Sequence, residues 1–187
     1  MRHKLIVLFF VCALQLSAMT IENVTVVQND EVTLTASWKA SSENDLAGYI
    51  VYWGKRCLSA EIFFSSDSLR LYDSFMDVGL DTFFVFPWYD DQPVYVAVIA
   101  YDTSLNFSKP SFEAAWAPLT FYDRYPKNNF ISPFDGYYFR DFYGMTRNFW
   151  LYDTAYDLNG DGVIMPSDRY LFNQNYGRST DEIFLAK

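Results

Sequence analysis

Residues 45–54 read DLAGYIVYWG, and the aromatic and β-branched residues in the second half of this stretch predict a β-strand. A polar turn, residues 41–45, precedes it. A second stretch of the same kind, VYVAVIAY, occupies residues 94–101. In residues 32–38 (VTLTASW) apolar residues alternate with Thr and Ser, which is the pattern of a strand with one buried and one solvent-exposed face. The fold is therefore expected to be built on β-strands.

Strands of this kind recur at short intervals between residues 21 and 117. Residues 82–86 (TFFVF) form another aromatic and β-branched run. Polar or proline-containing breaks separate the runs at residues 29–30, 90–93 and 108–110. Several short strands at this spacing predict an all-β sandwich of two sheets.

These stretches resemble strands of a bacterial fibronectin type III domain. Residues 37–39 and 45–54 look like its strands B and C, and residues 95–104 are similar to its strand F. The resemblance implies a fibronectin type III-like sandwich in which Trp38 is a core residue between the sheets and Tyr95 is the strand F tyrosine of the core. Such domains are mostly spacers or binding scaffolds, so the resemblance implies no chemical activity.

The charge balance and the residue types exclude several functions. The chain has 14 Lys and Arg against 23 Asp and Glu, a net charge of −9, and no basic cluster, which speaks against nucleic-acid binding. Outside residues 1–18 it has no histidine and one cysteine, Cys57. A Ser-His-Asp triad, a histidine-ligated zinc site and an internal disulfide are therefore excluded there. Cys57 is expected to be a small buried apolar residue.

Residues 1–18 are expected to be a secretory signal peptide. Arg2 and Lys4 give the start a positive charge, residues 5–14 form an apolar run, and Ala18 is a small residue at the expected cleavage site. The apolar run is too short to span a bilayer. The chain is therefore expected to be secreted, and to act outside the cell or at the cell surface.

The second half of the chain contains an internal duplication. Residues 128–144 match residues 161–177 at an offset of 33 residues, and the last ten residues of each share the pattern D-x-Y-x-F-x-x-x-Y-G. Each unit is predicted to be a loop followed by a short helix, which begins at Asp135 or Asp168 and ends at a glycine. Helices this short do not persist alone, so the two are expected to pack their aromatic faces together.

The loop of the second unit, DLNGDGVIMPSD at residues 157–168, has the pattern of a calcium site. Calcium binds about six to eight hard oxygen ligands, which alternate residues of a sharply bent loop can supply. Gly162 permits the bend. The predicted ligands are oxygen donors at alternate loop positions: Asp157, Asn159, Asp161, the Val163 carbonyl and Asp168. The alternative is a turn rich in Asp and Asn that holds no metal.

An Asp at the last loop position, a duplication and a short helix after each loop resemble a dockerin. Dockerins use two such units to bind a cohesin module and so attach secreted proteins to a scaffold, as in polysaccharide-degradation complexes. The resemblance covers about residues 121–180 and is strongest over residues 157–177. It implies partner contacts at loop positions 10 and 11, which are Pro133, Phe134, Pro166 and Ser167.

The first loop departs from this pattern. Arg124 and Pro126 stand where the first two ligands are expected. Asp123 can serve as the first ligand only if the loop has one additional residue. We therefore expect the first site to have lost calcium and to have kept its helix packing.

The predicted organisation is a signal peptide (1–18), a fibronectin type III-like sandwich (19–117) and a small all-α dockerin-like module (118–187), with a degenerate repeat at 121–146 and an intact repeat at 154–180. The predicted function is a secreted, non-enzymatic adaptor that binds calcium and a cohesin-like protein module. Two alternatives stay open. The first alternative to the adaptor is a structural subunit of a cell-surface layer or filament. The second is a small carbohydrate-binding or carbohydrate-active protein.

Overall fold

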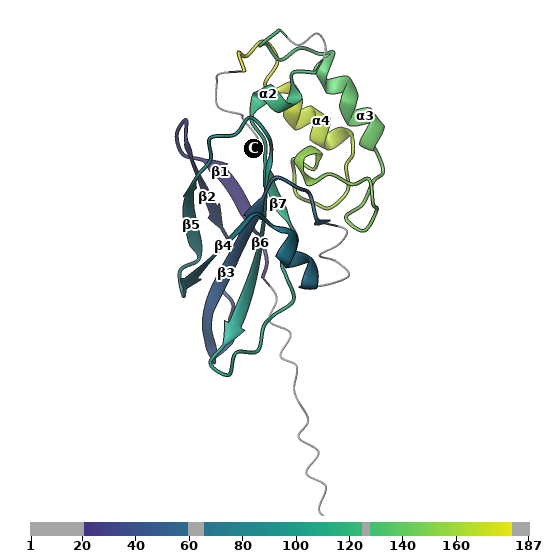
Figure 1. Ribbon diagram of the computed structural model, residues 1–187. Helices are drawn as coiled ribbons and strands as arrows, with labels where there is room; N and C mark the ends of the chain where they lie inside the picture. Colours follow the sequence, from purple (N-terminus) through teal and green to yellow (C-terminus); the bar gives the residue numbers. More distant parts are fainter. Residues whose placement is uncertain (1–20, 60–65, 125–127, 181–187) are drawn as a thin grey trace, which may run out of the picture.

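The computed structural model describes residues 21–59, 66–124 and 128–180. The described residues form seven strands in two antiparallel sheets, with strand orders β1-β2-β5 and β4-β3-β6-β7 (Figure 1). The strands are β1 (Thr25–Gln28), β2 (Thr33–Ser37), β3 (Leu46–Gly54), β4 (Ser74–Gly79), β5 (Phe83–Pro87), β6 (Val94–Asp102) and β7 (Ala114–Trp116). A 3-10 helix, η1 (Ser66–Leu71), precedes β4.

The predicted two-sheet sandwich is confirmed. The stretch at residues 45–54 becomes β3, which pairs with β4 on one side and β6 on the other. In chain order, β2, β3 and β6 take the places of strands B, C and F, as the fibronectin type III resemblance implied. Trp38 is 6% exposed in the core between the sheets and packs edge-on against Tyr49, with ring centroids 5.5 Å apart.

Tyr95 is buried, but not in the core that the resemblance implied. Successive side chains of a strand point to opposite faces of its sheet. On β6, Val94 and Val96 lie in the core between the sheets, whereas Tyr95 and Ala97 lie in a second core cluster. The expected position of Tyr95 in the core between the sheets is therefore wrong. The neighbouring residue, Val94, occupies that core instead.

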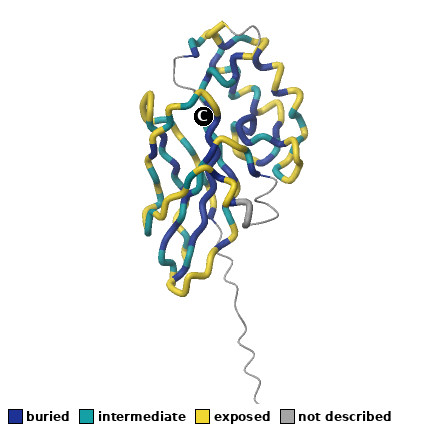
Figure 2. The backbone as a smooth tube through the Cα atoms, in the orientation of Figure 1, coloured by how far each residue is buried: buried dark blue, intermediate teal, exposed yellow. Residues whose placement is uncertain are grey.

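The second core cluster joins the sandwich to the remainder of the chain. After β7 the chain forms five short helical segments: α2 (Leu119–Tyr122), η2 (Asp135–Tyr138), α3 (Phe139–Phe142), η3 (Thr154–Tyr156) and α4 (Pro166–Asn173). They lie beside the sandwich next to the end of β7 (Figure 1). Tyr95, Ala97 and Ile99 from β6 share this cluster with residues of these segments: Tyr122, Phe139, Tyr156 and Phe172. Buried residues therefore continue from the sandwich into the helical region that follows β7 (Figure 2).

The C-terminal region is less regular than the predicted all-α module. Among the described residues, its three α-helices are short, the longest being α4 with 8 residues, and 3-10 turns and loops make up the rest. The β-sandwich thus predominates in the described residues. β7 ends at Trp116 and α2 begins at Leu119, on either side of the predicted boundary after residue 117.

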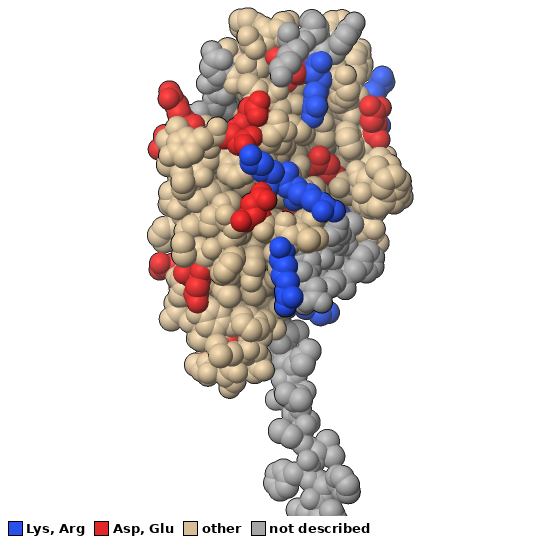
Figure 3. All heavy atoms as spheres, in the orientation of Figure 1, with Lys and Arg blue, Asp and Glu red and all other residues tan. Residues whose placement is uncertain are grey.

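The predicted signal peptide, residues 1–18, lies outside the described residues. No helix within the described ranges is long and apolar enough to cross a membrane. The face of the molecule in Figure 3 carries Lys and Arg side chains interspersed with Asp and Glu. That mixture agrees with the absence of a basic cluster in the sequence.

Candidate metal centre

The two repeats are linked by main-chain hydrogen bonds that recur at the 33-residue offset of the sequence match. Ile131 exchanges two such bonds, of 2.8 and 3.0 Å, with residues 177–178. Ile164 exchanges the equivalent pair, of 2.9 and 3.0 Å, with residues 144–145. Each loop is therefore fixed to the chain that leaves the helix of the other repeat, which gives the duplication an approximate twofold symmetry.

The helices after the loops bury equivalent side chains. Phe139 and Phe172 are each 0% exposed, and their ring centroids lie 5.0 Å apart. Asp135 Oδ2 accepts a hydrogen bond from the Ser132 main-chain N–H at 2.8 Å, and Asp168 Oδ2 accepts the equivalent bond from Met165 at 2.8 Å. The aromatic faces thus meet as the sequence predicted. The second helix, α4, begins at Pro166 rather than at the predicted Asp168, and Asp168 forms a capping box with Met165 at its start.

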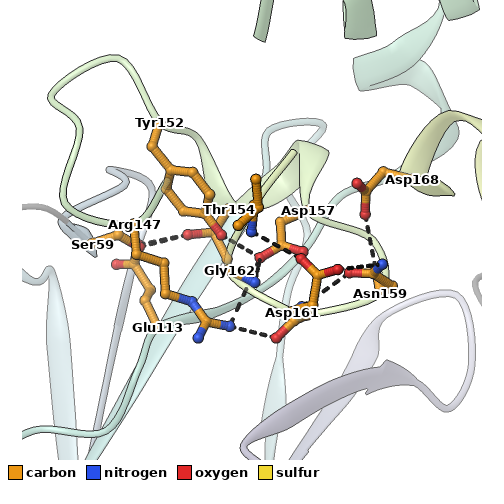
Figure 4. Close-up of polar contacts among 12 residues, drawn as sticks. Ser59, Glu113, Arg147, Tyr152, Thr154, Asp157, Asn159, Asp161, Gly162 and Asp168 are labelled. Atoms are coloured by element: carbon orange, nitrogen blue, oxygen red, sulfur yellow. Dashed lines mark hydrogen bonds and ion pairs between the residues drawn. The ribbon is translucent and has the colours of Figure 1, made fainter. Parts of the chain in front are cut away.

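Asp157, the first predicted ligand, has a fully buried carboxylate. Its Oδ2 accepts hydrogen bonds from the Gly162 main-chain N–H at 2.9 Å and from the Tyr152 hydroxyl (Figure 4). Its Oδ1 is also buried but has no hydrogen-bond partner. A buried carboxylate oxygen without a partner is energetically unfavourable. Among the described side-chain atoms of the loop, this is the buried oxygen that lacks a hydrogen-bond partner, so a ligand here would supply a missing interaction.

The other predicted side-chain ligands lie along the same loop and bond to one another and to the main chain. Asn159 Nδ2 donates to Asp161 Oδ2 at 2.9 Å. Asp161 Oδ1 accepts from the Val163 main-chain N–H at 2.9 Å, and Asp168 Oδ1 accepts from the Asn159 main-chain N–H at 3.1 Å. Burial raises the pKa of Asp168, and the negative charges of Asp157 and Asp161 raise it further.

This donor set suits calcium by chemistry, because three carboxylates, an amide oxygen and a main-chain carbonyl are all hard oxygen ligands. The partnerless Asp157 Oδ1 supports that fit. However, no group of three or more His, Cys, Asp or Glu in the described residues is placed to hold a metal ion. In this structure both oxygens of Asp168 accept main-chain hydrogen bonds, from Asn159 at 3.1 Å and from Met165 at 2.8 Å.

The first loop has the same main-chain framework as the second but different side chains. Asp123 Oδ2 accepts a hydrogen bond from the Asn129 main-chain N–H at 2.7 Å, as Asp157 does from Gly162. Asn129 (φ 65°) and Gly162 (φ 91°) both have the left-handed backbone that the bend requires. Asp123 therefore occupies the place of the first ligand in a loop with one more residue. Pro126 lies outside the described residues.

The four residues predicted to contact a partner are all exposed. Pro133 and Phe134 precede η2, and Pro166 and Ser167 open α4. Phe134 is 57% exposed and its ring lies edge-on to that of Tyr137, with centroids 6.0 Å apart.

The structure adds neighbours that the sequence did not single out. Tyr137 and Tyr170 are exposed, and Arg140 and Arg169 place their guanidinium groups 5.2 and 5.0 Å from the centre of the Tyr137 ring. Tyr137 and Tyr170 belong to the repeated pattern, but their exposure depends on how the helices pack. We call the surface made by the exposed residues Phe134, Tyr137, Arg140 and Tyr170 and the half-buried Arg169 the helix surface.

A buried acidic residue, Glu113, joins the sandwich to the second repeat. The Glu113 carboxylate accepts hydrogen bonds from donors in three segments of the chain: Leu58 N (3.0 Å), Ser59 Oγ (2.7 Å), Cys57 Sγ (3.2 Å), the Tyr72 hydroxyl and Thr154 Oγ1 (3.3 Å). Burial raises the pKa of Glu113. Burial and the neighbouring carboxylates also raise the pKa of Cys57, which makes this thiol a poor nucleophile.

The sequence matches no protein-family profile and no curated protein. Among solved structures, the chain is similar to the FN1–FN3 domains of chicken CNTN1, at 13% identity and a TM-score of 0.41, over 52% of this chain and 31% of that one. It is also similar to the third fibronectin III domain of the human KIAA0343 protein, at 14% identity and a TM-score of 0.40, over 52% of this chain and 79% of that one. A third similar structure is the Clostridium perfringens spore cortex lytic enzyme SleM, at 17% identity and a TM-score of 0.35, over 53% of this chain and 27% of that one.

Proposed function

We propose that the chain is a secreted, non-catalytic adaptor in which a dockerin-like duplicated unit binds calcium and attaches the sandwich to a cohesin-like protein module. The observation that carries the proposal is the contrast within the second loop. Its main chain is fixed by the symmetric bonds of the duplication, yet Asp157 Oδ1 is buried without a partner. A calcium ion bound through that oxygen supplies the missing interaction.

The residues that would hold the ion are Asp157, Asn159, Asp161, the Val163 carbonyl and Asp168. Calcium, when bound, supplies a double positive charge beside three carboxylates that otherwise repel one another. Because Asp168 also caps α4, its position links the loop to that helix. Calcium binding to the folded chain is therefore expected to stabilise the second repeat.

The helix surface is the proposed site for the partner. Aromatic side chains and Arg are enriched in protein interfaces, and here exposed Tyr137 lies beside two guanidinium groups while Tyr170 is also exposed. Phe134 and the other predicted contact positions, Pro133, Pro166 and Ser167, lie on the same pair of helix starts. The surface thus combines residues from both repeats, which is how a duplicated unit would present one binding face.

The sandwich serves as a spacer or binding module fixed to this unit. The shared core and the hydrogen bonds of Glu113 hold the two parts together. An attached partner is therefore expected to lie in a defined orientation to the sandwich.

The experiment compares thermal unfolding of the purified chain in calcium and in EDTA, for the wild type, D157N and D141N. Asp141 is an exposed carboxylate of α3 outside the loop, so D141N is the matched control for the loss of one negative charge. Calcium is expected to raise the Tm of the wild type and of D141N and to leave that of D157N unchanged. Equal gains in all three proteins, or none in any, would refute the calcium site.

A second experiment tests the attachment. Binding of a panel of cohesin modules is measured in calcium and in EDTA, with the wild type and with Y170A. Calcium-dependent binding that Y170A weakens supports the adaptor. Ordered self-assembly of the chain alone, seen by size-exclusion chromatography with light scattering, would instead favour the structural-subunit hypothesis.

A further inference from the structure

We propose that Arg147 is an internal cation of the second loop: its guanidinium partly neutralises the loop in the absence of calcium and thereby weakens calcium binding. This inference rests on the proposed calcium site. It concerns a residue that lies outside the loop and outside both repeated segments. The loop pattern alone gives no indication of it.

The main chain of Arg147 is fixed to the loop. Thr146 and Val163 form a β-bridge, and the Arg147 N–H donates to the Gly162 carbonyl at 3.2 Å. The equivalent bond of the other repeat joins the Thr180 N–H to the Asn129 carbonyl at 3.0 Å. The symmetric framework thus brings one residue to the bend of each loop, a neutral Thr at the first and an Arg at the second.

The side chain of Arg147 lies along the loop (Figure 4). Its guanidinium donates to the Gly160 carbonyl, and its Nη2 lies 3.8 Å from Asp157 Oδ2. The other side of the guanidinium lies over the ring of Phe112, 4.3 Å from the ring centre. The side chain is 20% exposed and is therefore held between the sandwich and the loop.

Gly162 allows the guanidinium to lie close to the main chain. A Cβ atom at residue 162 would lie 3.0 Å from Arg147 Cζ and Nη1, closer than ordinary packing allows. The guanidinium therefore packs directly against the main chain at the bend. Its positive charge lies next to one oxygen of Asp157, while the partnerless oxygen of the same carboxylate is left for the metal.

This arrangement has two opposite consequences. Without calcium, the guanidinium offsets part of the repulsion among Asp157, Asp161 and Asp168, so the empty loop is more stable than its sequence implies. With calcium, the same positive charge repels the ion across a single carboxylate. Removing the charge should therefore lower the stability of the metal-free chain and tighten calcium binding. Loss of a purely structural residue would instead lower that stability and weaken calcium binding.

The test measures calcium affinity by isothermal titration and Tm in EDTA for the full chain and three variants. R147Q removes the charge, R147K keeps it, and R70Q removes an exposed Arg at the end of η1, outside both repeats. R147Q is expected to lower the calcium Kd by about fivefold to tenfold and to lower the Tm in EDTA. R147K and R70Q are expected to keep Kd within about twofold of the wild type.

The outcomes separate this inference from the proposed function. A folded R147Q with unchanged or weaker calcium binding overturns the role of Arg147 and leaves the calcium site in place. Absence of binding in both the wild type and R147Q overturns both proposals. Calcium binding by R147Q but not by the wild type supports the role of Arg147. It would show that the charge of Arg147 prevents calcium binding in the wild-type loop. If R147Q does not fold, F112L, which removes the ring beneath the guanidinium, is expected to lower Kd by about twofold, and an unchanged Kd would contradict the proposal.

Discussion

The first and second loops have the same framework but differ in whether the carboxylate at their start is satisfied. In the first loop, both oxygens of Asp123 accept main-chain hydrogen bonds, from Asn128 at 3.3 and 3.2 Å and from Asn129 at 2.7 Å. In the second, Asp157 Oδ2 is bonded and Oδ1 has no partner. A duplicated unit can therefore keep its packing while the first carboxylate is fully hydrogen-bonded in one copy and keeps a buried oxygen without a partner in the other.

The largest expected effect comes from the packing that both repeats share. F172A removes a fully buried ring that contacts Phe139 and is expected to lower the free energy of unfolding by about 3–5 kcal/mol. Urea unfolding followed by tyrosine and tryptophan fluorescence measures this. A loss below about 1 kcal/mol would mean that the paired helices do not form the common framework.

The next effect concerns the attachment of the second repeat to the sandwich. E113Q replaces an acceptor of several hydrogen bonds by a group that offers one oxygen and two N–H donors, so buried donors lose their partner. We expect a loss of about 2 kcal/mol in the free energy of unfolding. Unfolding of E113Q in two separate transitions would show that Glu113 holds the two parts together, whereas wild-type stability would contradict this role.

The raised pKa of Glu113 also gives a pH dependence with a defined sign. Because burial raises this pKa, the folded chain binds the proton more tightly than the unfolded chain. The resulting stabilisation is complete below the ordinary pKa of the carboxyl and is lost as the pH rises through the raised, folded-state value. The stability difference between wild type and E113Q should therefore shrink over that interval. Chemical unfolding at a series of pH values checks this, and a difference that grows with pH would be inconsistent with it.

A smaller effect distinguishes the two loops directly. D123N replaces one carboxylate oxygen by an N–H donor and so removes an acceptor of the main-chain bonds to Asn128 and Asn129. It is expected to lower the free energy of unfolding by about 1–2 kcal/mol in EDTA. The further gain from calcium should equal that of the wild type. If calcium no longer stabilised D123N, the ion would have to bind in the first loop, contrary to the proposal.

The smallest effect is expected at the bend of the first loop. N129G places glycine at a left-handed position, which relieves backbone strain but adds freedom to the unfolded chain. The two contributions oppose each other, so the free energy of unfolding should change by less than about 1 kcal/mol. A larger loss would mean that the Asn129 side chain has a role that its main-chain bonds do not reveal.

The sequence was informative where a pattern was local and less so where a contact joined distant segments. The runs at residues 45–54 and 94–101 became β3 and β6, and the matched repeats formed equivalent hydrogen bonds. Tyr95 was assigned to the wrong face, because a run that is buried on both faces lacks the alternation that distinguishes them.

Arg147 and Glu113 gave no signal in the sequence, since their roles depend on partners far along the chain. Arg147 contacts Phe112, and Glu113 contacts Ser59 and Thr154. Nothing in the local pattern around either residue indicates these neighbours. The predicted ligands Asp157 and Asp161 were recognisable because they belong to one short loop.

The decisive measurement is the calcium stoichiometry of the purified chain by isothermal titration. A single site in the second loop predicts one calcium ion per chain, bound by the wild type and by D123N and not by D157N. Two ions per chain, none, or loss of binding in D123N but not in D157N would contradict it.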